Sequence, residues 1–238
     1  MISSLAIIAF AALIHASFQL SVSMLTLLSG HAIGAKTAHA RLLRLTTSFL
    51  CGVAVMTLFV VSFTSFLFQQ LFGAATPPLA WAVTCGLLFG LGVAVWAFYY
   101  RRQEGTSLWL PRSIARYLAD RAKATKQSAE AFGLGLSSVT GELIFILAPV
   151  TVASLVLIRM EPLWQLAGVA LYTVISLLSL LVVHALIGGG HKLSRIQKWR
   201  ETNKRFLQFA AGGGLLVLGF YVYVDQVIAA TAFAHGGF

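Results

Sequence analysis

The sequence predicts an all-α, polytopic membrane protein with six transmembrane helices arranged as two inverted three-helix repeats. Three observations lead to this fold class. The chain of 238 residues is 58% hydrophobic and only 10% charged, whereas soluble domains average about 45–50% apolar and about 25% charged residues. It contains six apolar runs of membrane length, and its basic residues gather in alternate connections between these runs.

Each of the six apolar runs is long enough to cross a hydrocarbon core of about 30 Å, which takes about 20 helical residues. The runs lie at 3–29, 43–72, 78–100, 131–158, 163–187 and 206–230. The first begins "MISSLAIIAF", without Lys or Arg, and is too long for the core of a signal peptide. We therefore expect it to be a retained first span.

The positive charges orient the spans. Of the 17 Lys and Arg residues, all except Arg159 lie in the connections that follow the first, third and fifth runs or, for Arg44, within two residues of one. The positive-inside rule places these three connections in the cytoplasm and both termini outside. The net charge of +10 is then expected to meet anionic lipids at the cytoplasmic face. No nucleic-acid partner is expected, because the basic residues are split over separate loops without a binding motif.

The six spans divide into a first repeat at 1–100 and a second at 131–238, joined by a basic cytoplasmic linker at 101–130. External termini give the two halves opposite orientations, which is the plan of many secondary transporters. Apolar residues of the linker share one helical face: Leu110, Ile114, Tyr117 and Leu118. This pattern favours an interfacial helix over a solvated one.

An acidic residue, Glu142, lies near the middle of the fourth run. An ionised carboxylate there costs about 2.5–3.5 kcal/mol even on lenient insertion scales. His15 lies at a matching depth in the first run. Sliding that run onto the fourth sets "HASFQL" (15–20) against "SVTGEL" (138–143), which pairs Gln19 with Glu142 and His15 with Ser138.

We therefore expect Glu142 and His15 to share a proton, to form a hydrogen-bonded pair, or to hold a cation. Neighbouring polar residues would complete this site: Gln19, Ser17, Ser138 and Thr140. The structural alternative is that a protonated Glu142 forms a hydrogen bond with a neighbouring helix and that His15 has its hydrogen-bond partners within the core.

Three further residues are candidates for gating. Gly141 precedes the acid, and Pro149 follows it and removes one backbone hydrogen bond, which allows a bent helix. His184, near the cytoplasmic end of the fifth run, is interpreted equally as structural or gating. The sequence assigns no metal.

The two cysteines, Cys51 and Cys85, form no C-x-x-C pair. Their depths in the membrane differ by about 8 Å, more than the usual Cα separation across a disulfide. Packed free thiols are therefore expected.

Three segments stand out within the arrangement of six spans as three plus three: "LLSGHAIGAKTAHARLLR", "FLCGVAVM" and "FGLGLSSVTGE". With them, the organisation resembles that of the lysine-exporter (LysE) superfamily and its relatives, the CcdA/DsbD transmembrane electron carriers. The electron carriers have a cysteine beside prolines in spans one and four, whereas the matching "IHASFQL" and "LSSVTGE" have none. The resemblance therefore implies export of a small solute or ion, often proton-coupled.

The sequence thus predicts a secondary transporter of the cytoplasmic membrane, without enzymatic activity or a cofactor. It has no G-x-x-x-x-G-K-[ST] motif, so active transport would draw on a gradient or a separate ATPase. One alternative is a non-transporting membrane component that docks partner proteins through its basic loops. Another is a thiol redox carrier that uses Cys51 and Cys85. A homo-oligomer or a membrane partner is left open.

Overall fold

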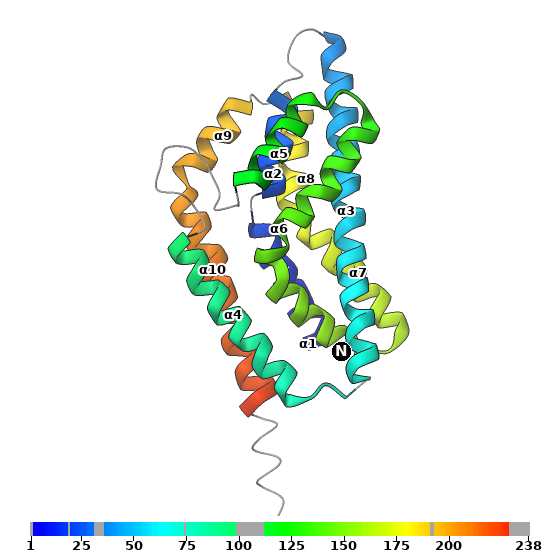
Figure 1. Ribbon diagram of the computed structural model, residues 1–238, viewed down its shortest axis with the longest axis vertical. Coiled ribbons are helices and arrows are strands. Elements are labelled where there is room, and N and C mark those ends of the chain that lie inside the picture. Colours follow the sequence, from blue (N-terminus) through cyan, green and yellow to red (C-terminus); the bar gives the residue numbers. More distant parts are fainter. Residues whose placement is uncertain are drawn as a thin grey trace, which may run out of the picture.

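The structure is a computed structural model that describes residues 2–18, 20–30, 36–73, 75–98, 112–190 and 193–228, and all elements in these ranges are helical (Figure 1). The α-helices are α1 (Ile2–Ser17), α2 (Leu20–Gly30), α3 (Lys36–Phe72), α4 (Pro78–Phe98), α5 (Arg112–Ala124), α6 (Ser128–Leu157), α7 (Pro162–Ser176), α8 (Leu178–Gly188), α9 (Leu193–Thr202) and α10 (Lys204–Val222). A π-helix, η1 (Tyr223–Ile228), continues α10.

Several of these helices are long and apolar enough to cross a membrane. Within the described ranges, α3, α4, α6 and α10 with η1 meet this condition, and the pair α7 and α8, bent by 49°, adds a fifth span if it is counted as one. The chain is therefore a membrane protein by the length and composition of its helices. The predicted runs at 43–72, 78–100 and 131–158 each lie on one helix, with ends within a few residues of α3, α4 and α6.

The first apolar run, which the sequence predicts as one span, consists of two helices. Helix α1 ends at Ser17 and α2 begins at Leu20. Neither glycine nor proline lies at this break. The fifth run is likewise divided, by the bend at Leu177.

Basic and non-basic connections lie at opposite ends of the helix bundle. Helices α5 and α9 and the start of α3, which carry basic residues, lie at the upper end in Figure 1. The N-terminus and the connection from α6 to α7, which contains Arg159, lie at the lower end. This is the separation of charge on which the predicted orientation depends.

Helices α3 and α6 form the closest packed pair. A Cβ atom added at Gly52 would meet the backbone carbonyl of Phe132, and one added at Gly135 would meet that of Phe49. Small residues at such a crossing let two helix backbones approach within a membrane. The two glycines therefore fix where α6, with Glu142 further along it, lies against α3.

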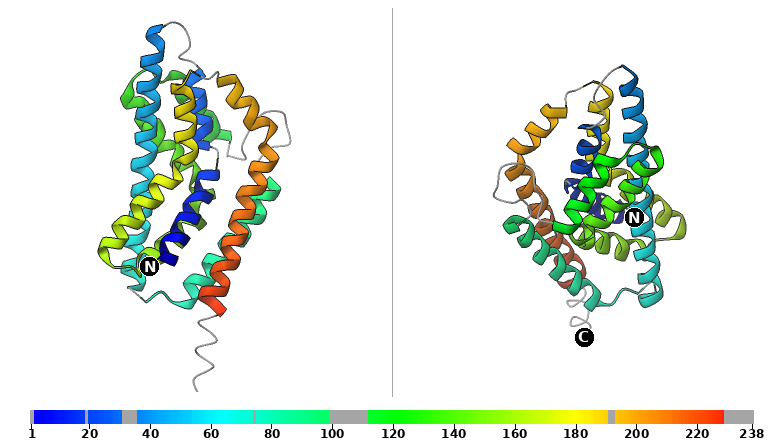
Figure 2. Two further views of the ribbon diagram at one scale, coloured as in Figure 1. Left: turned by 180° about the vertical axis from the view of Figure 1, so that it is seen from behind. Right: turned by 45° about the horizontal axis from the view of Figure 1, so that its top comes forward.

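Helices α4 and α10 form a second pair. Gly92 and Gly212 face each other at their crossing, and the indole N–H of Trp96 donates to the carbonyl of Phe209 at 3.1 Å. Helix α1 lies between this pair and α7, as the view from behind in Figure 2 shows. Its last turns are therefore enclosed by other helices.

The linker at 101–130 contains a helix, α5, as the sequence predicts. Leu118 and Ala122 are buried, and α5 packs against α2 and α6. Tyr117 is 53% exposed, and the predicted position of α5 at the membrane surface stays a prediction. Leu110 lies outside the described residues.

Candidate functional site

Glu142 lies near the centre of α6, about 21 Å from its first residue and about 23 Å from its last at 1.5 Å per residue. Its side chain is 3% exposed. The carboxylate accepts two hydrogen bonds from Ser21: Oε1 accepts its backbone N–H at 2.9 Å and Oε2 accepts its hydroxyl at 2.9 Å. The buried acid therefore has partners on α2.

The helix break explains this geometry. The first N–H groups of a helix have no partner within it, and in an apolar interior each needs one from elsewhere. Ser21 is the second residue of α2, and Glu142 supplies an acceptor for its N–H. The positive end of the helix dipole also favours a carboxylate at this place. Glu142 thus caps the second half of an interrupted helix.

Ser138 extends the polar cluster by one helical turn of α6. Its hydroxyl lies 3.2 Å from that of Ser21 and 2.8 Å from the carbonyl of Gly135, to which it donates. Glu142, Ser21 and Ser138 are joined by hydroxyl groups that can each donate and accept a hydrogen bond. The cluster could therefore pass a proton or hold a small polar ligand.

Two phenylalanines lie beside this cluster. Phe18, just before α2, and Phe145, one turn after Glu142 on α6, stack with ring centroids 5.7 Å apart and an interplanar angle of 27°. Both are buried. Along α6 and along the first run, these rings lie on the side of the cluster away from the basic end of the bundle. Along the first run, Phe18 comes between His15 and Ser21.

His15 does not join Glu142, contrary to the expected pairing. Its Nδ1 lies 3.1 Å from the hydroxyl of Tyr172 on α7, and both side chains are buried. The rings are tilted, with centroids 5.7 Å apart. His15 is therefore bonded to the neighbouring span.

The other predicted site residues are only partly brought together. Ser17 donates to the carbonyl of Ile14 at 2.6 Å on its own helix. Thr140 is exposed and donates to the carbonyl of Leu136, so it belongs to the outer face of α6. Gln19 lies outside the described residues. Of the expected polar residues, Ser138 is placed in the Glu142 cluster by its contact with Ser21.

The predicted gating residues are placed as follows. Gly141 and Pro149 are buried within α6, which remains one helix through the proline. The Nδ1 atom of His184 on α8 lies 3.0 Å from the hydroxyl of Thr46 on α3. The interruptions of the backbone are therefore at residues 18–19 and 177, not at Pro149.

The sequence alone does not predict two residues of this region, Ser21 and Arg200. The Arg200 side chain is 3% exposed and its guanidinium donates to the hydroxyl of Ser23 on α2 at 2.8 Å. A buried acid and a buried base thus contact α2 two residues apart. The sequence signal that could have indicated Arg200 is its spacing of four residues from the apolar Ile196, which places both on the buried face of α9.

Both cysteine thiols are free, as predicted. Cys85 is buried and lies 3.9 Å from the carbonyl of Gly219, but Cys51 is exposed and not packed. In the described ranges, no group of three or more His, Cys, Asp or Glu side chains could hold a metal ion. Comparisons with models of protein families, with curated proteins and with solved structures find no match.

Proposed function

We propose that the chain is a secondary transporter that exports a small solute or cation across the cytoplasmic membrane, with Glu142 as the residue that binds the transported species or the coupling proton. The observation that carries this proposal is the buried Glu142 carboxylate at the break between α1 and α2. Interrupted helices whose half-helix ends point at a polar site are a feature of secondary transporters.

The surroundings of Glu142 support this role over a purely structural one. An idle acid at this depth is costly, and a single N–H cap could come from a neutral side chain. The cluster is enclosed by Phe18 and Phe145 on one side, and Arg200 reaches α2 from the basic end. A transporter of this kind requires a central polar site that can be closed towards either face of the membrane, and these contacts support that role.

The helix packing supports six spans in two inverted repeats. The proposed spans are α1 with α2, α3, α4, α6, α7 with α8, and α10 with η1. In two related repeats, spans one, two and three correspond to spans four, five and six. A contact between spans two and four then predicts an equivalent contact between spans five and one. Both contacts occur, as α3 with α6 and as α1 with α7, and the third and sixth spans pack on each other. We propose both termini outside, by the positive-inside rule.

The experiment that tests the proposal measures access to the site without knowledge of the substrate. Ser138→Cys is introduced into a Cys51→Ala, Cys85→Ala background, because Ser138 is buried and touches the cluster. Vesicles of both orientations are treated with a membrane-impermeant methanethiosulfonate reagent. In a transporter the thiol reacts from both faces, at rates that change with pH, and Glu142→Gln removes the pH dependence.

Ser154→Cys in the same background is the matched control. Ser154 is equally buried on α6 but lies outside the cluster, so its thiol should remain unreactive. If the thiol at 138 is as unreactive as the one at 154 from both faces at every pH, the cluster is a static part of the core. The non-transporting interpretation would then take its place.

A further inference from the structure

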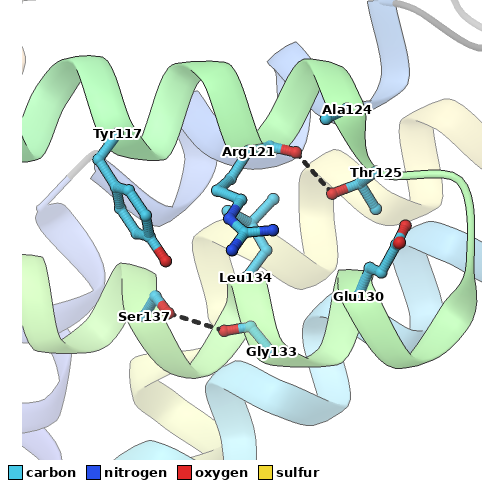
Figure 3. Close-up of a pocket in the computed structure, with 8 residues that line it drawn as sticks. All are labelled: Tyr117, Arg121, Ala124, Thr125, Glu130, Gly133, Leu134 and Ser137. Carbon is cyan, nitrogen blue, oxygen red and sulfur yellow. Dashed lines mark hydrogen bonds between the residues drawn. The ribbon is translucent and has the colours of Figure 1, made fainter.

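A groove of about 250 Å³ lies between α5 and the first turns of α6. Tyr117 and Arg121 line it from α5, Thr125 lines it just after α5, and Glu130 and Ser137 line it from α6. Figure 3 shows the side chains of Tyr117 and Arg121 pointing from α5 towards α6, with Glu130 at the other end of the groove. The groove lies apart from the Glu142 cluster, whose member Ser138 faces α2.

Arg121 offers the groove a set of unused donors. Its guanidinium lies 5.7 Å from the centre of the Tyr117 ring, and in the described part of the chain its N–H groups donate no hydrogen bond to another residue. A guanidinium presents five donors in a planar fork that fits a phosphate. The Tyr117 hydroxyl points towards the same space (Figure 3). This end of the groove therefore suits a phosphate group.

Glu130 offers an acceptor at the opposite end. The backbone N–H groups of Lys126 and Gln127 both donate to its Oε2 atom, at 2.7 and 3.1 Å. No hydrogen bond within the described ranges uses its Oε1 atom. A cationic N–H donor at that oxygen would form a charge-assisted hydrogen bond. The groove thus presents a cation and an anion to one ligand, which is a zwitterionic pattern.

The exposed face of α6 continues from the groove towards the middle of the bundle. Thr140, whose hydroxyl donates to the carbonyl of Leu136, and Ile144 follow Ser137 on this face and are exposed. Glu130 lies about 18 Å along α6 from Glu142 at 1.5 Å per residue, and half of a hydrocarbon core measures about 15 Å. The groove is therefore at headgroup depth, with the exposed face of α6 where acyl chains would lie.

We propose that this groove binds the headgroup of a phospholipid with a primary amine, of the phosphatidylethanolamine type. Its phosphate accepts hydrogen bonds from Arg121, its ammonium donates to Glu130, and its acyl chains run along α6 towards Ile144. A choline headgroup has no N–H to donate to Glu130, and a glycerol headgroup has no cation for it. The bound lipid joins the linker helix α5 to α6. This site does not depend on the proposed transport function.

The test uses the purified full-length protein in detergent and measures its thermal unfolding midpoint against added short-chain lipid. Dioctanoyl phosphatidylethanolamine should raise the midpoint more than the choline and glycerol lipids of the same chain length. Arg121→Gln should raise the apparent Kd for the ethanolamine lipid about tenfold, the effect of losing a charge-assisted bond. Glu130→Gln, which keeps an acceptor for the Lys126 and Gln127 amides, should remove the preference for ethanolamine over choline.

Arg116→Gln is the matched control, because Arg116 is an exposed arginine of α5 that does not line the groove. It should bind the ethanolamine lipid as the wild type does. Should Arg121→Gln unfold without lipid, Arg121→Lys keeps the charge but not the fork and should weaken binding in the same direction. Equal effects of the three lipids on the wild type would overturn the proposal, as would an Arg121→Gln protein that binds like Arg116→Gln. Equal affinity for O-phosphorylethanolamine would overturn the lipid assignment in favour of a soluble ligand.

Discussion

The backbone N–H and the hydroxyl of Ser21 both donate to the Glu142 carboxylate. The two donors differ in whether another acceptor lies within reach. The Ser21 hydroxyl can turn to another acceptor, since Ser138 lies 3.2 Å away. The Ser21 N–H cannot, because it belongs to the first turn of α2 and points at Oε1. The stability of the break therefore depends on an acceptor at position 142 more than on a charge there.

Truncation and neutralisation of Glu142 should consequently have different effects on stability. Glu142→Ala leaves the Ser21 N–H buried without a partner and should lower the free energy of unfolding by about 1–3 kcal/mol. Glu142→Gln keeps an acceptor and should lower it by less. Chemical unfolding in mixed micelles measures both variants. Equal losses would mean that the charge, and not the acceptor, holds α2.

The buried hydrogen bond between His15 and Tyr172 gives an independent prediction. His15→Phe and Tyr172→Phe each remove one side of a bond that joins α1 to α7. A double-mutant cycle should give a coupling free energy of about 0.5–1.5 kcal/mol, the net value of a typical hydrogen bond. Unfolding of the two single variants and the double variant measures it. Strict additivity would show that the two side chains do not interact.

The sequence predicted Glu142 and Ser138 as site residues, but not Ser21, whose hydroxyl contacts both of them. The depth and chemistry of Glu142 follow from its position in an apolar run. The partner of Glu142, Ser21, lies 121 residues away. Neither glycine nor proline marks the start of its helix, α2. The proposed pair with His15 used equal depth alone, and depth does not say which way a side chain points around a helix.

At the level of elements, the contact of α3 with α6 offers the sharpest test. Gly52→Ala places a methyl group against the carbonyl of Phe132 and should destabilise the protein by about 1–3 kcal/mol, as overpacking does. Gly86→Ala is the control, because nothing lies within 4 Å of a Cβ at that position. It should be neutral or stabilising, since alanine favours a helix more than glycine does. Unfolding midpoints compare the two.

Helix α9 gives a second prediction for an element. Arg200→Gln removes the guanidinium that donates to Ser23, whereas Lys198→Gln changes an exposed residue of the same helix. Loss of a bond to a charged group should speed amide hydrogen exchange in α9 about tenfold. Lys198→Gln should leave the exchange unchanged. Similar exchange in both variants would mean that Arg200 does not hold α9 to α2.

The helix positions were largely predictable and their interruptions were not. Apolar runs mark α3, α4 and α6 because burial in lipid requires an unbroken apolar sequence of a set length. The break at 18–19 and the bend at Leu177 occur in equally apolar sequence. Both are set by contacts with other helices, which a single-sequence pattern does not contain.

For the whole molecule, the separation of basic residues to one end predicts the orientation in the membrane. Tags at residues 1 and 238 should be accessible on the external face of intact cells. Protease or antibody accessibility measures this, with a tag inserted in the 101–130 linker as the cytoplasmic control. Exposure of the terminal tags only after permeabilisation would reverse the orientation and would place α5 outside.

We expect the two interruptions to divide the bundle into parts that move separately. Helices α3 and α6 cross with their backbones in contact at Gly52 and Gly135, so we expect them to move as one unit. The adjoining first and fifth runs each consist of two helices, α1 with α2 and α7 with α8. We therefore expect any opening at the basic end of the bundle to move α2 and α8 relative to α3 and α6, and to leave α1 and α7 in place.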